Sequence, residues 1–219
     1  MGHWTTLDTA RGQVAAWHAA PTSRPLGGLV VIQEIFGANA HVRAVADGFA
    51  AAGYEVLAPA FFDLVEKNAE LDYDPAGRDK GLALVEALGV EAALEVVAAA
   101  AAALAPAGKV GTVGYCWGGT IALLAALRLG LPSVSYYGAR NLRYLDEKPQ
   151  AAVMFHFGSL DGRIPGEAIQ QHRERLPQMP VFVYPAGHAF NRDGDPHYHE
   201  ASARLARERT LAFFSENLR

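Results

Sequence analysis

Residues 110–124, VGTVGYCWGGTIALL, join a short apolar run to an apolar helical pattern through a turn that is rich in glycine. The run up to Tyr115 is typical of a buried strand, and the residues from Gly119 onward are typical of a helix. The single cysteine of the chain, Cys116, stands at the junction. Glycine permits close backbone approach and unusual dihedral angles. The segment therefore predicts a sharp strand-to-helix turn with Cys116 at its apex.

Composition narrows the class of protein. The chain has 219 residues, of which 51% are hydrophobic and 19% charged, enough to bury a substantial core. The formal net charge is -4 and no dense Lys/Arg tract occurs, which argues against nucleic-acid binding. We expect no membrane span, since the alanine-rich residues 91–105 are short and weakly apolar. A lone cysteine cannot form an intramolecular disulfide, and this fits the expected cytoplasmic location. The protein is expected to be a monomer or a small homo-oligomer.

Short apolar runs alternate with longer helical patterns along the whole chain. This alternation predicts βαβ units, that is, one α/β domain over residues 1–219 with a mainly parallel sheet and helices on both faces. Gly53 is expected to end the helix within residues 41–53. Gly89 is expected to interrupt the helical segment within residues 75–104. The expected strands lie within residues 27–33, 54–62, 108–116, 131–138, 151–162 and 179–188, and the expected helices within 41–53, 75–104, 118–130 and 200–218.

Four chemically active side chains follow expected strands. Glu34, Cys116, Asp161 and His188 each come directly after an apolar run. In an open α/β sheet, functional groups gather beyond the carboxyl ends of the strands. The order nucleophile, acid, histidine is that of the α/β-hydrolase triad, and G-x-C-x-G matches its nucleophile elbow with sulfur in place of oxygen. The sequence therefore predicts a Cys116–His188–Asp161 triad.

Two of these residues, Cys116 and Asp161, also have a structural interpretation. A single cysteine can be an inert core residue, and Asp161 lies in GSLDGRIP, where aspartate is a common turn former. His197 and His199 lie near Asp193 and Asp195 in the sequence, a combination that could bind a metal. Their spacing matches no tight metal-ligand set, so no metal is expected. A surface or core role is the default for the histidines at positions 3, 18, 41, 156 and 172.

Five blocks spread along the chain match one family pattern in the family's own order. They are QEIFG at 33–37, GYCWGG at 114–119, GSLDGRIP at 158–165, AGHAF at 186–190 and ERTLAFF at 208–214. Through them the sequence resembles the dienelactone hydrolase family, the carboxymethylenebutenolidases. The resemblance implies a compact α/β-hydrolase without a large lid, which opens a small lactone by acyl transfer through a cysteine and uses no cofactor.

The resemblance also assigns roles to individual residues. Cys116 would be the nucleophile, His188 the general base and Asp161 the carboxylate that orients it. Glu34 would be the family's additional acid, which helps to deprotonate the thiol when substrate binds. The backbone N–H groups of Ile35 and Trp117 are expected to form the oxyanion hole.

Two arginines correspond to the family's carboxylate-binding residues. Arg192 follows His188 by four positions, and Arg78 lies in a more divergent segment. The alternative for Arg192 is an arginine at the surface, paired with Asp193 or Asp195. Leu82 stands where familiar family members carry aromatic side chains, and so does Val85. The substrate is therefore expected to be a small lactone or ester that resembles a dienelactone and carries a carboxylate, but not necessarily the dienelactone itself.

Other functions use the same fold. A broad-specificity carboxylesterase or thioesterase would need the same machinery and would differ only in substrate. A catalytically silent α/β-hydrolase that binds a small ligand usually lacks one triad member, whereas all three are present here. The sequence therefore favours a hydrolase of small esters or lactones.

Overall fold

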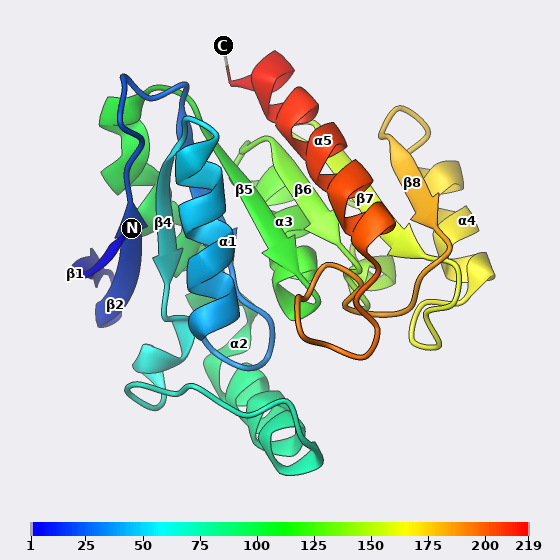
Figure 1. Ribbon diagram of the computed structural model, residues 1–219, viewed down its shortest axis with the longest axis horizontal. Coiled ribbons are helices and arrows are strands. Elements are labelled where there is room, and N and C mark those ends of the chain that lie inside the picture. Colours follow the sequence, from blue (N-terminus) through cyan, green and yellow to red (C-terminus); the bar gives the residue numbers. More distant parts are fainter. Residues whose placement is uncertain (1, 219) are drawn as a thin grey trace. The chain divides into compact units, whose positions relative to one another are not determined.

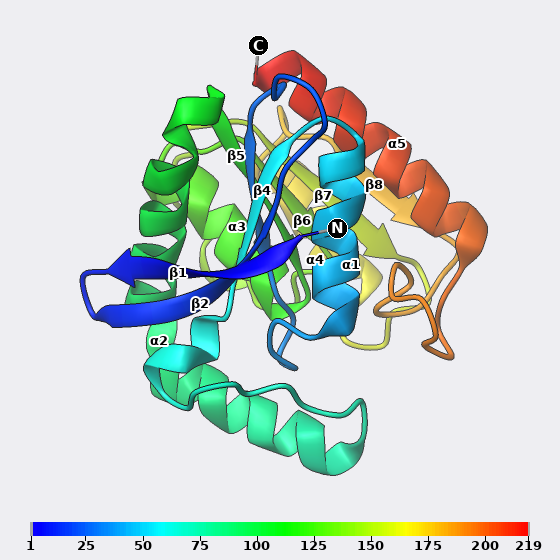
Figure 2. The same ribbon diagram turned by 60° about the vertical axis from the view of Figure 1, so that its left-hand side comes forward.

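A computed structural model describes residues 2–218 (Figures 1 and 2). Its contacts group the described residues into two compact units, the first with residues 2–112 and 218 and the second with residues 113–217. Strand β5 (Val110–Tyr115) crosses this division. Each unit combines strands with helices, and the pairings within them are described in turn.

The first unit contains four strands in the order β1-β2-β4-β3. Strands β1 and β2 form an antiparallel hairpin, β2 pairs antiparallel with β4, and β4 pairs parallel with β3. Their bounds are β1 (His3–Thr9), β2 (Gly12–Ala19), β3 (Gly28–Ile32) and β4 (Glu55–Pro59).

The N-terminal hairpin was not among the expected elements. Figure 2 shows β1 and β2 running side by side at the N-terminus. Gly12 closes the turn with a φ of 128°, and the Thr9 hydroxyl donates to the Gly12 carbonyl at 2.7 Å. Most of β1 is exposed, so its sequence lacks the continuous apolar run of a strand that is buried on both faces.

Two helices cover opposite faces of the first unit's strands (Figures 1 and 2). Helix α1 (Ala40–Ala51) is capped by Asn39, whose Oδ1 accepts from the Val42 N–H at 3.2 Å. Helix α2 (Pro75–Leu104) is capped by Asp74, which accepts from the Gly77 N–H at 2.7 Å. Such side-chain caps satisfy N–H groups that the helix itself leaves without an acceptor.

The two predicted glycine positions are confirmed. Gly53 follows α1 with a φ of 102°, and Gly89 kinks α2 with a φ of 72°. Both values lie in the left-handed region that glycine tolerates best. Short 3₁₀ helices follow β4 and α2; they are η1 (Phe61–Leu64) and η2 (Ala105–Ala107).

Within residues 2–218, one helical segment is long and apolar enough to cross a membrane. It covers residues 75–107, with a mean hydropathy of 1.8 in its most apolar window, of which 44% is buried. The helix reaches this length because it continues through the kink at Gly89, and the expectation of no membrane span stays a prediction. Such a helix is weak evidence of a span, since the core helix of a soluble protein passes the same test.

The second unit contains the strand order β5-β6-β7-β8, and the β6–β7 and β7–β8 pairs are parallel. Figure 1 shows α5 on one face of these strands and α3 and α4 on the other. The bounds are α3 (Trp117–Arg128), β6 (Ser133–Tyr136), η3 (Asn141–Arg143), β7 (Val153–Gly158), α4 (Gly166–Arg175), β8 (Val181–Tyr184) and α5 (Glu200–Asn217).

These elements confirm the predicted α/β class with mainly parallel strands. Strands β3, β5, β6 and β7 are buried along their whole length, as their continuous apolar runs predict. Helix α4 was missed, because its residues are mostly polar and it buries only three side chains. That residues 1–219 form a single domain stays a prediction.

A buried polar network joins three strands of the second unit to α5. His156 on β7 contacts the Tyr184 hydroxyl through Nδ1 at 2.8 Å and Thr210 Oγ1 through Nε2 at 3.1 Å. Thr210 in turn contacts the Tyr136 hydroxyl at 2.7 Å. Burial, together with the nearby Arg209 charge, lowers the pKa of His156 from 6.5 to about 3. This histidine is therefore a neutral hydrogen-bonding group of the core.

His172 is the second buried histidine of this unit. Its Nδ1 lies 2.7 Å from the Ala168 carbonyl, and its ring packs edge-on against Phe155 and Phe157. Burial lowers its pKa from 6.5 to about 4, although the backbone hydrogen bond opposes the shift. Of the surface or core roles expected by default for these two histidines, the structure shows the core role.

The two lowered pKa values predict acid sensitivity. The unfolded chain protonates both histidines below about pH 6.5, whereas the folded chain keeps His172 neutral to about pH 4 and His156 to about pH 3. The free energy of unfolding should therefore be unaffected by them above pH 6.5. It should fall below that pH by up to about 1.4 kcal/mol per pH unit for each histidine.

Urea unfolding between pH 7.5 and 4.5 measures this slope. In His156→Gln and His172→Gln, the free energy of unfolding should depend less steeply on pH, because one histidine no longer takes up a proton on unfolding. The carboxylates contribute equally to the slope in all three proteins. A slope identical in wild type and both variants would contradict the prediction.

Candidate active site

The strand-to-helix turn predicted from sequence is present at Cys116. The residue follows β5 and precedes α3, with a φ of 54° and a ψ of -114°. Its N–H donates to the Tyr136 carbonyl on β6 at 3.0 Å, and its carbonyl accepts from the Gly119 N–H at 3.0 Å. Non-glycine residues rarely adopt a positive φ, and such strain gathers at functional sites.

Neighbouring glycines make this turn possible. A Cβ at Gly114 would lie 1.9 Å from the Gly118 carbonyl oxygen, and one at Gly119 would lie 2.5 Å from the Tyr136 carbonyl oxygen. Both obstacles are backbone atoms, so neither can move aside cheaply. Close packing of strand, turn and helix therefore requires glycine at Gly114, the first glycine of the G-x-C-x-G pattern, and at Gly119.

His188 and Asp161 are brought together from positions 27 residues apart. His188 lies in the loop after β8, and its Nδ1 lies 2.7 Å from Asp161 Oδ2 in the loop after β7. The other carboxylate oxygen accepts from the Arg163 N–H at 2.9 Å. The Asp161 side chain is fully buried, and that of His188 is 14% exposed. The carboxylate thus holds the imidazole from one side.

Cys116 also influences the pKa of the His188 imidazole. His188 Nε2 is buried and has no oxygen or nitrogen partner among the residues that the structure describes. Burial opposes the charged imidazole, but hydrogen bonds to Asp161 and Cys116, together with the charges of both groups, raise the pKa of His188 from 6.5 to about 10. The arrangement therefore favours the protonated imidazole.

Tyr137 is a site residue that the sequence did not reveal. Its ring centroid lies 5.0 Å from that of His188, and its side chain is fully buried. Its N–H donates to the His156 carbonyl at 2.8 Å, and its φ is 40°. A positive φ at a non-glycine residue leaves no signal in the sequence, so only the structure identifies this position.

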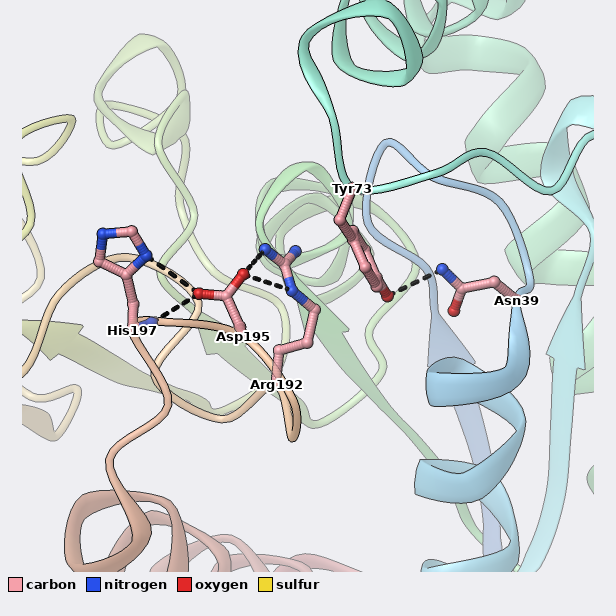
Figure 3. A network of polar contacts seen from close by, with 5 residues as sticks. All are labelled: Asn39, Tyr73, Arg192, Asp195 and His197. Carbon is pink, nitrogen blue, oxygen red and sulfur yellow. Dashed lines mark hydrogen bonds and ion pairs between the residues drawn. The ribbon is translucent and has the colours of Figure 1, made fainter.

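Glu34 and Ile35 belong to the first unit, directly after β3. Their exposed fractions are 2% and 4%. A Cβ at Gly81 of α2 would lie 2.0 Å from the Ile35 carbonyl oxygen, so the helix packs closely on this loop. The same loop ends at Asn39, whose Nδ2 donates to the Tyr73 hydroxyl at 2.8 Å (Figure 3). The catalytic roles expected of Glu34 and Ile35 stay predictions.

The two expected carboxylate-binding arginines have different environments. Arg78 is exposed in the first turn of α2. Arg192 is 9% exposed and pairs with Asp195 in the loop after β8 (Figure 3). The alternative weighed from sequence was thus correct about the partner but wrong about a surface location. Leu82 and Val85, which stand where the family has aromatics, are half-buried and buried.

Within residues 2–218, no group of three or more His, Cys, Asp or Glu side chains is placed to hold a metal ion. His197 and His199, considered as metal ligands from sequence, have other contacts. His197 Nδ1 lies 2.9 Å from Asp195 Oδ1, and His199 Nδ1 lies 2.8 Å from the Ser202 hydroxyl at the start of α5.

Comparison with known proteins agrees with this geometry. The model of the dienelactone hydrolase family matches residues 14–218. The chain belongs to the dienelactone hydrolase family. A carboxymethylenebutenolidase of Cupriavidus pinatubonensis is 32% identical over 211 residues, covering 91% of this chain and 90% of that protein. Another from Pseudomonas putida is 33% identical over 208 residues, covering 90% and 88%.

A solved structure also resembles the chain. It comes from Klebsiella pneumoniae, is provisionally described as a dienelactone hydrolase, and is 28% identical with a TM-score of 0.88. The match covers 99% of this chain and 98% of that one. The fold is therefore that of the dienelactone hydrolases, and the protein is a hydrolase of this class.

The close approach at Gly114 predicts a severe effect of one methyl group. Gly114→Ala places Cβ against backbone at 1.9 Å and should lower the free energy of unfolding by about 3 kcal/mol, the upper range of overpacking. Gly162→Ala is the control, since a Cβ there meets nothing within 4 Å. Urea unfolding measures both variants, and comparable small losses would show that the turn relaxes easily.

The contact with Asp161 predicts a change in the pKa of His188. Asp161→Asn removes a charge and a charge-assisted acceptor, so the pKa of His188 should fall from about 10. Nuclear magnetic resonance titration of the imidazole measures it. Asp193→Asn, in the exposed part of the loop after β8, should leave the pKa unchanged. A His188 pKa that is the same in wild type and Asp161→Asn would refute this account.

Proposed function

We propose that the protein is a cysteine hydrolase that opens a small lactone or ester through an acyl-enzyme. The observation that carries the proposal is the juxtaposition in the second unit. Cys116 occupies a strained turn at the end of β5, and His188 connects it with the buried Asp161. A nucleophile, a base within reach and a group that orients the base form the pattern of covalent catalysis.

The raised pKa of His188 decides where the proton lies before reaction. At neutral pH the imidazole holds a proton. The proposed attacking species is the thiolate of Cys116. In this proposal His188 serves first as an acid and only later as a base.

Acylation follows from this arrangement. Cys116 Sγ attacks the carbonyl carbon, and the carbonyl oxygen becomes an oxyanion. Trp117 is the first residue of α3. Its N–H is the proposed donor to the oxyanion, with the N–H of Ile35 as the second. When the C–O bond breaks, His188 Nε2 gives its proton to the departing alkoxide.

Deacylation reverses the proton transfer. His188, now neutral, takes a proton from water, whose oxygen attacks the thioester carbon, and the thiolate leaves. In a lactone the alcohol formed by ring opening remains attached to the acyl group, so a single hydroxy acid is released. With an open-chain ester the alcohol departs first, and the same residues suffice for both.

Glu34 and Arg78 extend the proposal. Glu34 is proposed to assist proton transfer at the thiol and Arg78 to bind a substrate carboxylate, both on the strength of the family pattern. A broad carboxylesterase or thioesterase remains the alternative within the same chemistry. Turnover of a carboxylated lactone, a neutral aryl ester and a thioester, measured side by side, separates these substrates.

Replacement of the nucleophile tests the proposal directly. Cys116→Ala should lower kcat/KM for a neutral aryl acetate by at least about a thousandfold, since removal of a nucleophile leaves only binding and electrostatic catalysis. Cys116→Ser should also be strongly impaired, because a site that stabilises a thiolate activates a hydroxyl poorly. Mass spectrometry of wild type quenched early in the reaction should show the acyl group on Cys116.

Urea unfolding is the control, and both variants should remain folded. Retention of most activity in Cys116→Ala would overturn the cysteine mechanism. It would leave the family assignment unaffected.

A further inference from the structure

Thr210 of α5 is the centre of the buried polar network that joins this helix to β6, β7 and β8. Figure 1 shows α5 lying across these strands. Tyr136 pairs with His156 in the β6–β7 register, and Gly158 pairs with Tyr184 in the β7–β8 register. Because side chains alternate along a strand, Tyr136, His156 and Tyr184 all point to one face of the sheet. With Thr210 they are at most 2% exposed, so their hydrogen bonds have to be made within the protein.

The number of available protons fixes the direction of these hydrogen bonds. Thr210 Oγ1 donates its one proton to the Ala206 carbonyl at 2.8 Å, because a carbonyl can only accept. The Tyr136 hydroxyl at 2.7 Å and His156 Nε2 at 3.1 Å therefore both donate to Thr210. With its proton on Nε2, the neutral imidazole accepts at Nδ1 from the Tyr184 hydroxyl, 2.8 Å away. Thr210 thus fixes one tautomer of His156.

Arg209 completes the network next to Tyr184. Its Nη1 donates to the Tyr184 hydroxyl at 3.1 Å, and its guanidinium carbon lies 4.1 Å from the centroid of the Phe182 ring. The chain of donors then runs from Arg209 through Tyr184 and His156 to Thr210. Every hydroxyl and ring N–H along it has an acceptor, so removal of the Thr210 hydroxyl leaves two buried donors without one.

The residues that contact Thr210 also hold the candidate active site through their backbone. The Tyr136 carbonyl accepts from the Cys116 N–H at 3.0 Å. The His156 carbonyl accepts from the Tyr137 N–H at 2.8 Å, and the Tyr137 ring packs on His188 with a centroid distance of 5.0 Å. The side chains of these two strand residues thus bind α5, while their carbonyls bind the candidate nucleophile and the packing partner of the base.

Tyr184 connects the network with the other two triad residues. Its carbonyl accepts from the Ser159 N–H at 2.7 Å and from the Ala186 N–H at 2.8 Å. Ser159 begins the turn that leads to Asp161, and Ala186 precedes His188 by two positions. Each of the three loops that carry a triad residue is therefore bound by a carbonyl of a network residue.

We propose that Thr210 is a positioning residue, which holds Cys116 and His188 in place through the strand ends of the second unit. Reacting groups need such support, because an error of about 1 Å in their placement can lower a rate about a hundredfold. The inference rests on the proposed function and deepens it, since it extends the site to a helix that carries none of the proposed catalytic residues.

Nuclear magnetic resonance of the imidazole nitrogens tests the hydrogen-bond directions without substrate. In the wild type, the proton of His156 should lie on Nε2 and should exchange slowly, because the ring is buried. Thr210→Val keeps the shape of the side chain and removes the acceptor, so the resonance of this proton should move. A wild-type proton on Nδ1 would contradict the network as described.

Turnover of a neutral aryl acetate tests the positioning role. Thr210→Val should lower kcat about tenfold and leave KM within about twofold, because it changes the placement of the reacting groups more than substrate binding. The pKa of His188 should fall from about 10, since the hydrogen bonds to Asp161 and Cys116 that raise it are held less well. A merely stabilising role would lower the urea midpoint and leave kcat and this pKa unchanged.

Matched variants separate the hydroxyl from its surroundings. Thr210→Ser keeps the hydroxyl and should keep kcat within about twofold of the wild type, although it removes a buried methyl group. Ser202→Ala removes another buried hydroxyl of α5, which lies 2.8 Å from His199 Nδ1, and should leave kcat unchanged. Tyr136→Phe keeps its ring and removes only one donor to Thr210, so it should fold and should lower kcat by less than Thr210→Val does.

Two results would overturn the inference: an unchanged kcat and His188 pKa in Thr210→Val, or an equal loss of kcat in Thr210→Ser. If Thr210→Val does not fold, an unchanged kcat in Tyr136→Phe has the same meaning. Failure of the proposed function would appear differently, as ester turnover that survives Cys116→Ala. The His156 tautomer and the His188 pKa would still report whether Thr210 fixes these groups.

Discussion

The backbone of Cys116 has to pass from a strand into a helix within one residue, and this constraint shapes the surrounding structure. A φ of 54° costs a non-glycine residue about 1–3 kcal/mol. The strain is offset by burial on both sides, since every residue of β5 is buried and nearly all of α3 is buried as well. The neighbouring backbones approach so closely that a side chain at Gly114 has no space. Packing thus holds the sulfur at the end of the strand.

Two buried histidines of the second unit show how environment decides chemistry. His156 contacts neutral hydroxyl groups, and burial lowers its pKa to about 3. His188 is also buried, yet the carboxylate of Asp161 and the sulfur of Cys116 raise its pKa to about 10. Burial disfavours the charged ring in both cases, and only adjacent negative charge reverses the outcome. One histidine is therefore a structural group, and the other is suited to move protons.

The loop after β8 contains both the candidate base and a buried ion pair. It carries His188 toward Asp161, and four residues later it carries Arg192 into contact with Asp195. The backbone hydrogen bond from Arg192 to Ala189 links the two parts. One short loop therefore holds both the candidate base and this ion pair.

Sequence by itself determined the α/β class, the turn at Cys116 and the ends of several elements. These features depend on local rules, namely continuous apolar runs and glycine where φ is positive. The order of Cys116, Asp161 and His188 was also readable, because each follows a strand. The exposed hairpin at the N-terminus and the polar helix α4 escaped, since neither has the apolar pattern of a buried element.

Tertiary structure decided which groups meet. The contact of His188 with Asp161 spans 27 residues, and the packing of Tyr137 on His188 depends on a backbone angle that no residue type announces. The pattern at Arg192 allowed an ion pair with either of two aspartates, and the fold places Arg192 beside Asp195. Local sequence specifies backbone conformation because the interactions responsible act between residues a few positions apart. The pKa values and the balance of charge arise instead from contacts between distant segments.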